Sequence, residues 1–90
     1  MNKPDYDHIS ETLKVIGHPV RLKMLQGILK DECNVAQIQN KLGLPQSTIS
    51  QHLSILRNRG ILEARREGTK RCHKVVNKTV IKILKMIAEK

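Results

Sequence analysis

The chain has 90 residues, enough for one domain with a small hydrophobic core, and its 39% apolar content is that of a globular protein. Because Tyr6 is the single aromatic residue, the core must be aliphatic. The 17 Lys and Arg residues against 8 Asp and Glu give a net charge of +9. This charge favours a polyanionic partner, either a nucleic acid or an acidic membrane surface.

Several classes of protein are disfavoured by the sequence. No stretch approaches the roughly 18 apolar residues of a membrane span, and the first ten residues contain no apolar run typical of a signal peptide. Cys33 and Cys72 are too few for a disulfide scaffold and lack the spacing of zinc ligands. No nucleophile–base pair, carboxylate pair or phosphate loop indicates an enzyme. We therefore expect a cytoplasmic protein that binds rather than catalyses.

The first half of the chain predicts three helices. The first covers residues 7–16 at helical apolar spacing. Pro19 opens the second, with His18 as its cap, and this helix is apolar on most sides, which predicts a central, buried position. Asn34 is placed to cap a third helix over residues 35–42.

The second half predicts a fourth helix, a hairpin and a fifth helix. Pro45 opens the fourth helix, which ends at Gly60. Residues 61–76 predict two strands around a turn at residues 67–69, and a last helix follows over about residues 77–89. We therefore expect residues 1–90 to form a single winged helix-turn-helix domain, mainly α with a small β-wing, in the order α-α-α-α-β-β-α.

The fourth helix has two contrasting faces. Ile49, Leu53 and Leu56 lie on one face at 3.6-residue spacing. The opposite face carries short polar side chains, namely Ser47, Gln51, Ser54 and Asn58. These are poorer helix formers than Lys or Glu, so solvation alone does not favour them. A helix that enters a DNA major groove, about 12 Å wide, needs short amides and hydroxyls that reach the base edges. The pattern indicates a recognition helix.

The hairpin supplies positive charge next to this helix. Its cations are Arg65, Arg66, Lys70 and Arg71. Such a cluster can straddle a phosphate backbone or enter a minor groove, although the alternative of a merely solvated loop exists. Arg57, late in the fourth helix, is better placed for a phosphate than for a base.

Three segments resemble the ArsR/SmtB family of bacterial repressors: IGHPVRLKML, NVAQIQNKLGLPQSTISQHLSIL and GILEARREGTKR. The match runs from about residue 12 to 76. The resemblance implies a homodimer, paired through its first and last helices, that binds an imperfect inverted repeat of double-stranded DNA near a promoter. It also implies base contacts from Gln46, Ser47, Thr48, Ser50 and Gln51.

The two terminal helices hold more apolar side chains than we expect one small core to cover. They are Ile9, Leu13 and Ile16 in the first helix and Val80, Ile83, Leu84 and Ile87 in the last. We therefore expect these residues to form the dimer interface across a two-fold axis.

Many members of the resembled family respond to a metal, but the ligands of the two common sites are missing. The thiolate positions correspond here to Asn34 and Ala36, and the last helix carries Lys78, Lys82 and Lys85 instead of Asp and His. We expect no metal site and no cofactor. The four histidines lie on separate predicted elements, which leaves open that two of them meet in the fold.

Cys33 and Cys72 have two interpretations. They can be small packing residues, or they can form a thiol switch. In winged-helix folds the segment before the third helix can pair with the returning wing strand, which would bring residues 31–34 beside 71–75. The cations around Cys72 would lower its thiol pKa. A disulfide would then shift the wing and weaken DNA binding.

A winged-helix module that binds an acidic protein is an alternative to a DNA-binding repressor. Protein interfaces prefer aromatic and apolar anchors at their centre, and the polar face of the fourth helix offers none. A redox-responsive or metal-responsive repressor of the same family is a further alternative.

Overall fold

The computed structural model describes residues 3–33 and 35–88. Over these residues the chain forms α1 (Tyr6–Ile16), α2 (Pro19–Lys30), α3 (Val35–Leu42), α4 (Gln46–Asn58), β1 (Leu62–Glu67), β2 (Lys70–Val75) and α5 (Lys78–Ala88). The predicted order of elements is confirmed. The predicted cap at Asn34 lies outside the described residues.

Local side-chain contacts fix where the helices begin. The His18 Nδ1 accepts a hydrogen bond from the Val20 N–H at 3.1 Å, and Pro19 is the first residue of α2, as predicted. The Asn77 Oδ1 accepts from the Val80 N–H at 3.1 Å at the start of α5. Each bond satisfies a backbone donor that the helix itself leaves unpaired.

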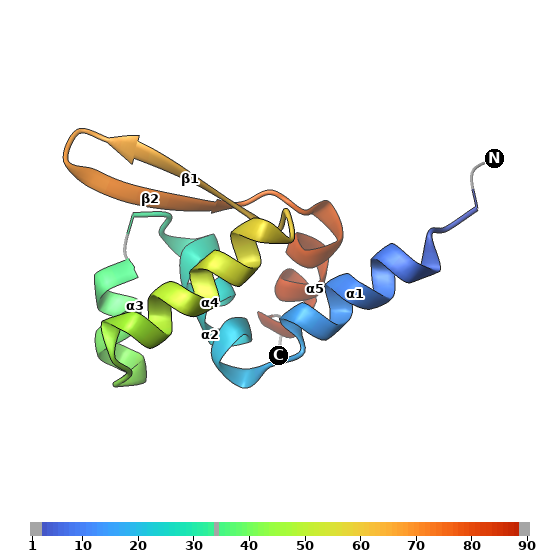
Figure 1. Ribbon diagram of the computed structural model, residues 1–90, viewed down its shortest axis with the longest axis horizontal. Coiled ribbons are helices and arrows are strands. Elements are labelled where there is room, and N and C mark those ends of the chain that lie inside the picture. The colour runs from blue at the N-terminus through green and yellow to red at the C-terminus, as the bar shows by residue number, and fades with distance from the viewer. Residues whose placement is uncertain (1–2, 34, 89–90) are drawn as a thin grey trace.

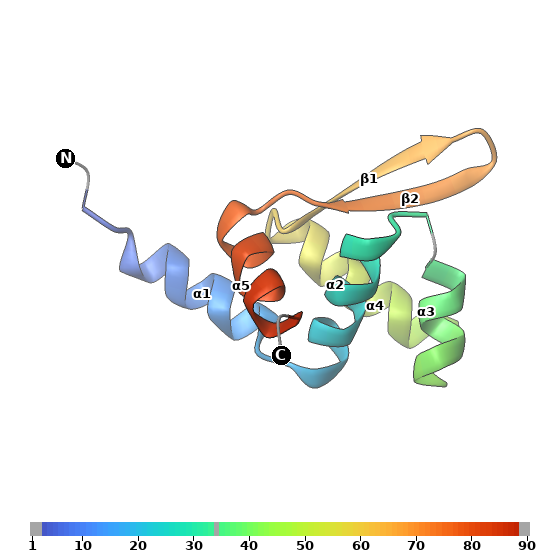
Figure 2. The same ribbon diagram turned by 180° about the vertical axis from the view of Figure 1, so that it is seen from behind.

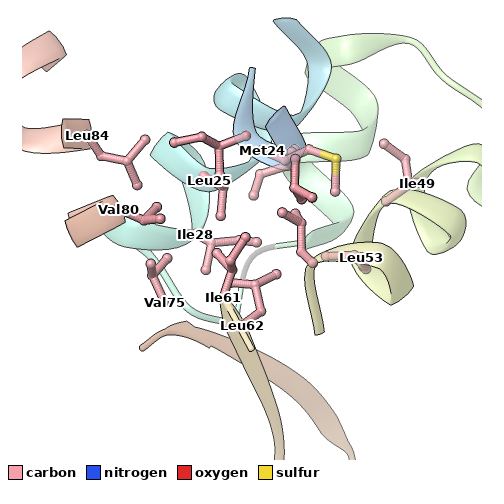
Figure 3. Close-up of a cluster of buried hydrophobic side chains, with 14 residues drawn as sticks. Met24, Leu25, Ile28, Ile49, Leu53, Ile61, Leu62, Val75, Val80 and Leu84 are labelled. Carbon is pink, nitrogen blue, oxygen red and sulfur yellow. The ribbon is translucent and has the colours of Figure 1, made fainter. Parts of the chain in front are cut away.

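Helix α2 occupies the centre of the hydrophobic core, as its apolar sequence predicts. Met24, Leu25 and Ile28 are fully buried. Figure 3 shows the side chains that surround them, which come from α4 (Ile49, Leu53), the turn before β1 (Ile61), the two strands (Leu62, Val75) and α5 (Val80, Leu84). Gly27 lets α3 approach closely, because a Cβ there would lie 2.8 Å from the side chain of Ile38.

The hairpin of β1 and β2, which we call the wing, is antiparallel and runs in register from the pair Leu62↔Val75 to the pair Glu67↔Lys70. Gly68 turns the chain with a φ of 62°, a conformation that glycine adopts without strain. The base of the wing is buried at Leu62 and Val75, and its far end is exposed. The wing extends beyond the helices on the side of α3 and α4 (Figure 1).

Helices α1 and α5 lie at the other end of the molecule from the wing tip, and both views show them side by side (Figures 1 and 2). No helix in the ranges 3–33 and 35–88 has the length and apolar character to cross a membrane.

The expected dimer interface needs a correction. Ile16, Val80 and Leu84 are at most 3% exposed and belong to the core of the chain itself. They face α2 and its neighbours, so they cannot supply a surface for a second copy. Of the expected residues, Leu13 is 46% and Ile87 is 43% exposed, whereas Ile9 and Ile83 are half-buried.

Candidate nucleic-acid interface

The two faces of α4 are separated as predicted. Ile49, Leu53 and Leu56 are buried in the core. The residues on the outward side with exposed side chains are Gln46, Ser47, Ser50, Gln51 and Asn58, while Thr48 and Ser54 are half-buried. Pro45 precedes the helix, and no side chain caps its first turn. The polar surface is thus held on a rigid helix whose position is set by its apolar face.

The register of the wing divides its cations between two faces. Arg66 pairs across the strands with Arg71, and Arg65 pairs with Cys72. Because side chains alternate along a strand, Arg66, Arg71 and His73 share one face, whereas Arg65, Lys70 and Cys72 share the other. The positive charge predicted for the wing is therefore not presented on one side.

A groove of about 290 Å³ joins the wing to α4. Its polar walls include Gln46, Ser50 and Arg57 from α4 and Arg71 and His73 from β2. The wing face that carries Arg71 is thus adjacent to the amino-terminal half of α4. Of the predicted DNA-binding residues, the structure brings Gln46, Ser50, Arg57 and Arg71 together around this groove.

His73 connects the wing to α4 and was missed as a functional residue in the sequence. It is 2% exposed, and its Nε2 lies 3.2 Å from an Arg57 guanidinium nitrogen. Burial lowers the pKa of His73, and the nearby charges of Arg57 and Arg71 lower it further. A neutral ring can accept from Arg57 at Nε2, which leaves the buried Nδ1 without a hydrogen-bond partner among the described residues. Arg57 therefore serves the contact with the wing as well as the outer surface.

Arg65 differs from the other wing cations. Its guanidinium donates to the carboxylates of Glu32 and Glu67, and these hydrogen bonds, with Glu32 first, raise the pKa of Arg65. The spacing of residues in the wing gave no signal for this, because Glu32 is 33 residues away. Across the described residues, no carboxylate lies within ion-pair distance of Arg66, Lys70 or Arg71. Arg65 is the wing cation least available to a phosphate.

The two cysteines are joined by a disulfide, and their Cα atoms are 4.2 Å apart. The predicted approach of the α2–α3 turn to residues 71–75 is confirmed for Glu32 and Cys33, because the His73 N–H donates to the Glu32 carbonyl at 2.8 Å. Residue 34 lies outside the described residues. Cys33 is half-buried and Cys72 is fully buried. A carboxylate oxygen of Glu67 lies near both sulfurs, and the three atoms are within 4.8 Å of one another. Metals bind the thiolate, so this group could hold a cation only in reduced protein.

Two of the four histidines meet in the fold. The rings of His18 and His52 have their centroids 5.0 Å apart. The His18 Nδ1 caps α2, and the His52 Nδ1 accepts from the Arg21 guanidinium at 3.2 Å. Burial, then the charge of Arg21, lowers the pKa of His52. The pair has a structural role in seating α4 on α2.

Large apolar side chains that remain exposed are found only on the terminal helices, within the described part of the chain. They are Tyr6 and Leu13 on α1 and Met86 and Ile87 on α5. The exposed large apolar side chains of the described residues are thus confined to these two helices.

Comparison with known proteins gives a consistent picture. The family model described as "Bacterial regulatory protein, arsR family" matches residues 18–64, slightly more than half of the chain. An uncharacterised HTH-type transcriptional regulator of Methanocaldococcus jannaschii is 38% identical over 93% of this chain and 96% of its own length. The transcriptional repressor PagR of Bacillus anthracis is 39% identical over 87% of this chain and 79% of PagR.

Solved structures agree with these sequence matches. The crystal structure of PagR has a TM-score of 0.79 at 37% identity and covers 91% of this chain and 94% of that one. The repressor BigR of Xylella fastidiosa has a TM-score of 0.79 at 27% identity and covers 91% of this chain and 84% of BigR.

Proposed function

Since the chain belongs to the arsR family of bacterial regulatory proteins, we propose that it is a homodimeric transcriptional repressor that binds an imperfect inverted repeat near a promoter. Its winged helix-turn-helix fold is that of the regulators it resembles. The observation that carries the proposal is the exposed face of α4, which is polar, carries short side chains and adjoins Arg71 of the wing.

The polar face of α4 would read the bases. The proposed contacts in the major groove are Gln46, Ser47, Thr48, Ser50 and Gln51, with Ser54 at the edge. Amides and hydroxyls can donate to and accept from base edges, and the resemblance to the family supports the same five positions. We assign phosphate contacts to Arg66, Lys70 and Arg71, and a secondary one to Arg57. Arg65 is left out because two carboxylates already hold it.

A second copy of the chain would pair with the first through α1 and α5. The exposed apolar side chains of these helices support this arrangement, since they would otherwise stay in water. We propose an interface built from Ile9, Leu13, Ile83 and Ile87, joined by Tyr6 and Met86. A two-fold axis there would set the two α4 helices in successive major grooves, about 34–36 Å apart.

The residues 1–90 would act as one domain, because a single hydrophobic cluster draws side chains from every element between α1 and α5. We propose that the chain acts in the cytoplasm, where its DNA partner would be found. The relatives are named as transcriptional regulators, and we propose a regulatory role for this chain and no catalytic one.

The alternative is a winged-helix module that binds an acidic protein through its basic wing. The exposed face of α4 does not favour it, because it lacks apolar anchors. The exposed large apolar side chains of the protein lie on α1 and α5, away from the wing cations that this alternative would use.

Selection of bound fragments from the host genome tests the proposal. We expect fragments that share an imperfect inverted repeat upstream of genes, and repression of those genes by the intact chain. Equal affinity for every duplex would contradict the proposal, as would retention by an acidic protein that competes with DNA for the wing.

A further inference from the structure

We propose that Cys33 and Cys72 form a reversible redox site that regulates the proposed DNA-binding surface, and that the bonded form binds the operator more tightly. The site is the disulfide between the α2–α3 turn and the middle of β2. This inference rests on the proposed function, since it concerns how well that surface is held in place.

The disulfide is the strongest connection between the wing and the α2–α3 turn. Beside it, the His73 N–H donates to the Glu32 carbonyl, and Arg65 reaches across to the Glu32 carboxylate. Ion pairs that are exposed to water contribute little, because solvent and salt screen them. The side chains of Arg65 and Glu32 are 43% and 34% exposed, respectively. Without the covalent bond, one backbone hydrogen bond and a screened ion pair would connect the wing to the α2–α3 turn, beside the contact of His73 with Arg57 of α4.

The two cysteine residues differ in exposure, which assigns their roles. Cys33 is half-buried, whereas Cys72 is fully buried within β2. An incoming reagent can reach Cys33 only. The positive charges around Cys72 suggested in the sequence that it was the reactive thiol, but its burial reverses this order. Cys33 is the attacking thiol and Cys72 the resolving thiol.

The oxidant that fits this asymmetry is a low-molecular-weight disulfide, RSSR. The Cys33 thiol loses its proton to solvent, and the thiolate attacks one sulfur of RSSR, which forms a mixed disulfide and releases RS⁻. The Cys72 thiolate, whose proton also passes to solvent, then attacks the Cys33 sulfur and expels the second RS⁻. The protein loses two electrons and two protons, and RSSR becomes two RSH. A dithiol reductant reverses both steps by the same exchange.

The bond acts on DNA binding through Arg71, the neighbour of Cys72. With the bond formed, Arg71 lies in the same groove as Gln46 and Ser50, so α4 and the wing are already arranged side by side. A surface ordered before it binds loses less conformational freedom on binding. We therefore expect the opposite sign from the one that the sequence alone suggested. The bonded form should bind roughly 3- to 10-fold more tightly, the range that corresponds to ordering about one side chain.

The first part of the test concerns the chemistry of the two thiols. The full chain is reduced with dithiothreitol, freed of it without air, and treated with oxidised glutathione, and its mass is followed. We expect wild type to lose two hydrogens, Cys72→Ala to keep one glutathione on Cys33, and Cys33→Ser to react slowly or not at all. If dithiothreitol cannot reduce the disulfide in the native protein, the proposal that the site is reversible is overturned. Equal adduct rates in the two variants overturn the assigned roles.

The second part measures affinity for a duplex selected by the reduced chain from random-sequence DNA. We expect the oxidised wild type to bind more tightly than the reduced one, and Cys33→Ser to match the reduced wild type with and without oxidant. Unchanged or weakened binding on oxidation overturns this inference alone. If no form of the chain distinguishes the selected duplex from other DNA, the proposed function itself fails.

Discussion

The outward face of α4 and the outward faces of α1 and α5 are both exposed, yet the first carries amides and hydroxyls and the second carries Tyr6, Leu13, Met86 and Ile87. Each face is opposite an apolar stripe that is buried against α2. The difference follows from what each would touch. Polar groups lose little by being exposed in the free protein and regain hydrogen bonds at base edges, whereas apolar groups gain by leaving water against a like surface.

The largest effect should come from a charge on the apolar surface. Ile87→Lys would place an ammonium group where the second copy is expected, and desolvating it there is costly. We expect a monomer at micromolar concentration and a loss of operator affinity of roughly 100-fold or more, because the two α4 helices no longer bind as a linked pair. Sedimentation and DNA titration measure both.

Lys85→Ala is the matched control, since this exposed residue of α5 lies on its polar side. It should remain dimeric. Leu84→Lys does not test the interface, because Leu84 is fully buried in the chain's own core and its replacement should unfold the protein. A dimer that survives Ile87→Lys would mean that the apolar surface has another use.

A smaller effect is expected on the polar surface. Gln51→Ala should reduce the discrimination between the selected site and sites with one changed base pair by about 1–3 kcal/mol, the worth of a good bidentate contact. Asn58→Ala removes the same amide from the last turn of α4 and should leave discrimination unchanged. Titrations against a set of singly substituted duplexes measure both variants. The same loss in both would indicate general destabilisation of α4 rather than base reading.

A still smaller effect is expected in the wing, where two arginines on opposite faces of the hairpin can be compared. Arg71→Ala should weaken all duplexes alike and lower the slope of affinity against salt by about 1, because one phosphate contact is lost. Arg65→Ala should do much less, since its guanidinium already binds Glu32 and Glu67 on the opposite face of the hairpin. Fluorescence anisotropy over a series of salt concentrations measures both slopes. Equal effects would contradict the division of the wing into two faces.

The smallest effect concerns pH. The pKa of His73 is lowered in the folded chain, first by burial and then by Arg57 and Arg71, so the unfolded state binds more protons. His73 therefore favours folding fully above its unfolded pKa of about 6.5, and this contribution is lost as the pH falls through the lower folded pKa. Thermal unfolding should show a stability that decreases from pH 7 to 5.5. Because glutamine does not titrate, the stability of His73→Gln should decrease less steeply over the same pH range.

Most of the element boundaries could be predicted from the sequence, because proline and glycine residues start or end helices through their local backbone preferences. Pro19, Gly43 and Pro45 each set a start or an end by their own backbone preferences, and the structure agrees within one or two residues. The buried face of α4 was also predictable, since Ile49, Leu53 and Leu56 recur at one period.

The contacts between distant segments were much harder to predict. Periodicity identifies an apolar stripe on α5 but cannot tell whether Leu84 meets its own core or a second copy, and here it meets the core. The pairing of Arg65 with Glu32 depends on the strand register and on the path of the α2–α3 turn. The approach of Cys33 to Cys72 was predictable because winged-helix topology itself supplies it. The burial of Cys72 was not, because its charged sequence neighbours suggested exposure.

The disulfide divides the molecule in a topological sense. It spans 39 residues of sequence, and the covalent ring it closes contains α3, α4, β1 and the first part of β2, hence every residue proposed to touch DNA. Helices α1, α2 and α5 lie outside the ring. In the bonded chain, a single protease cut anywhere between Cys33 and Cys72 would leave one covalent molecule, whereas the same cut in α1 or α5 would release a fragment. The terminal helices can therefore be removed by proteolysis while the segment proposed to contact DNA remains a covalently closed ring.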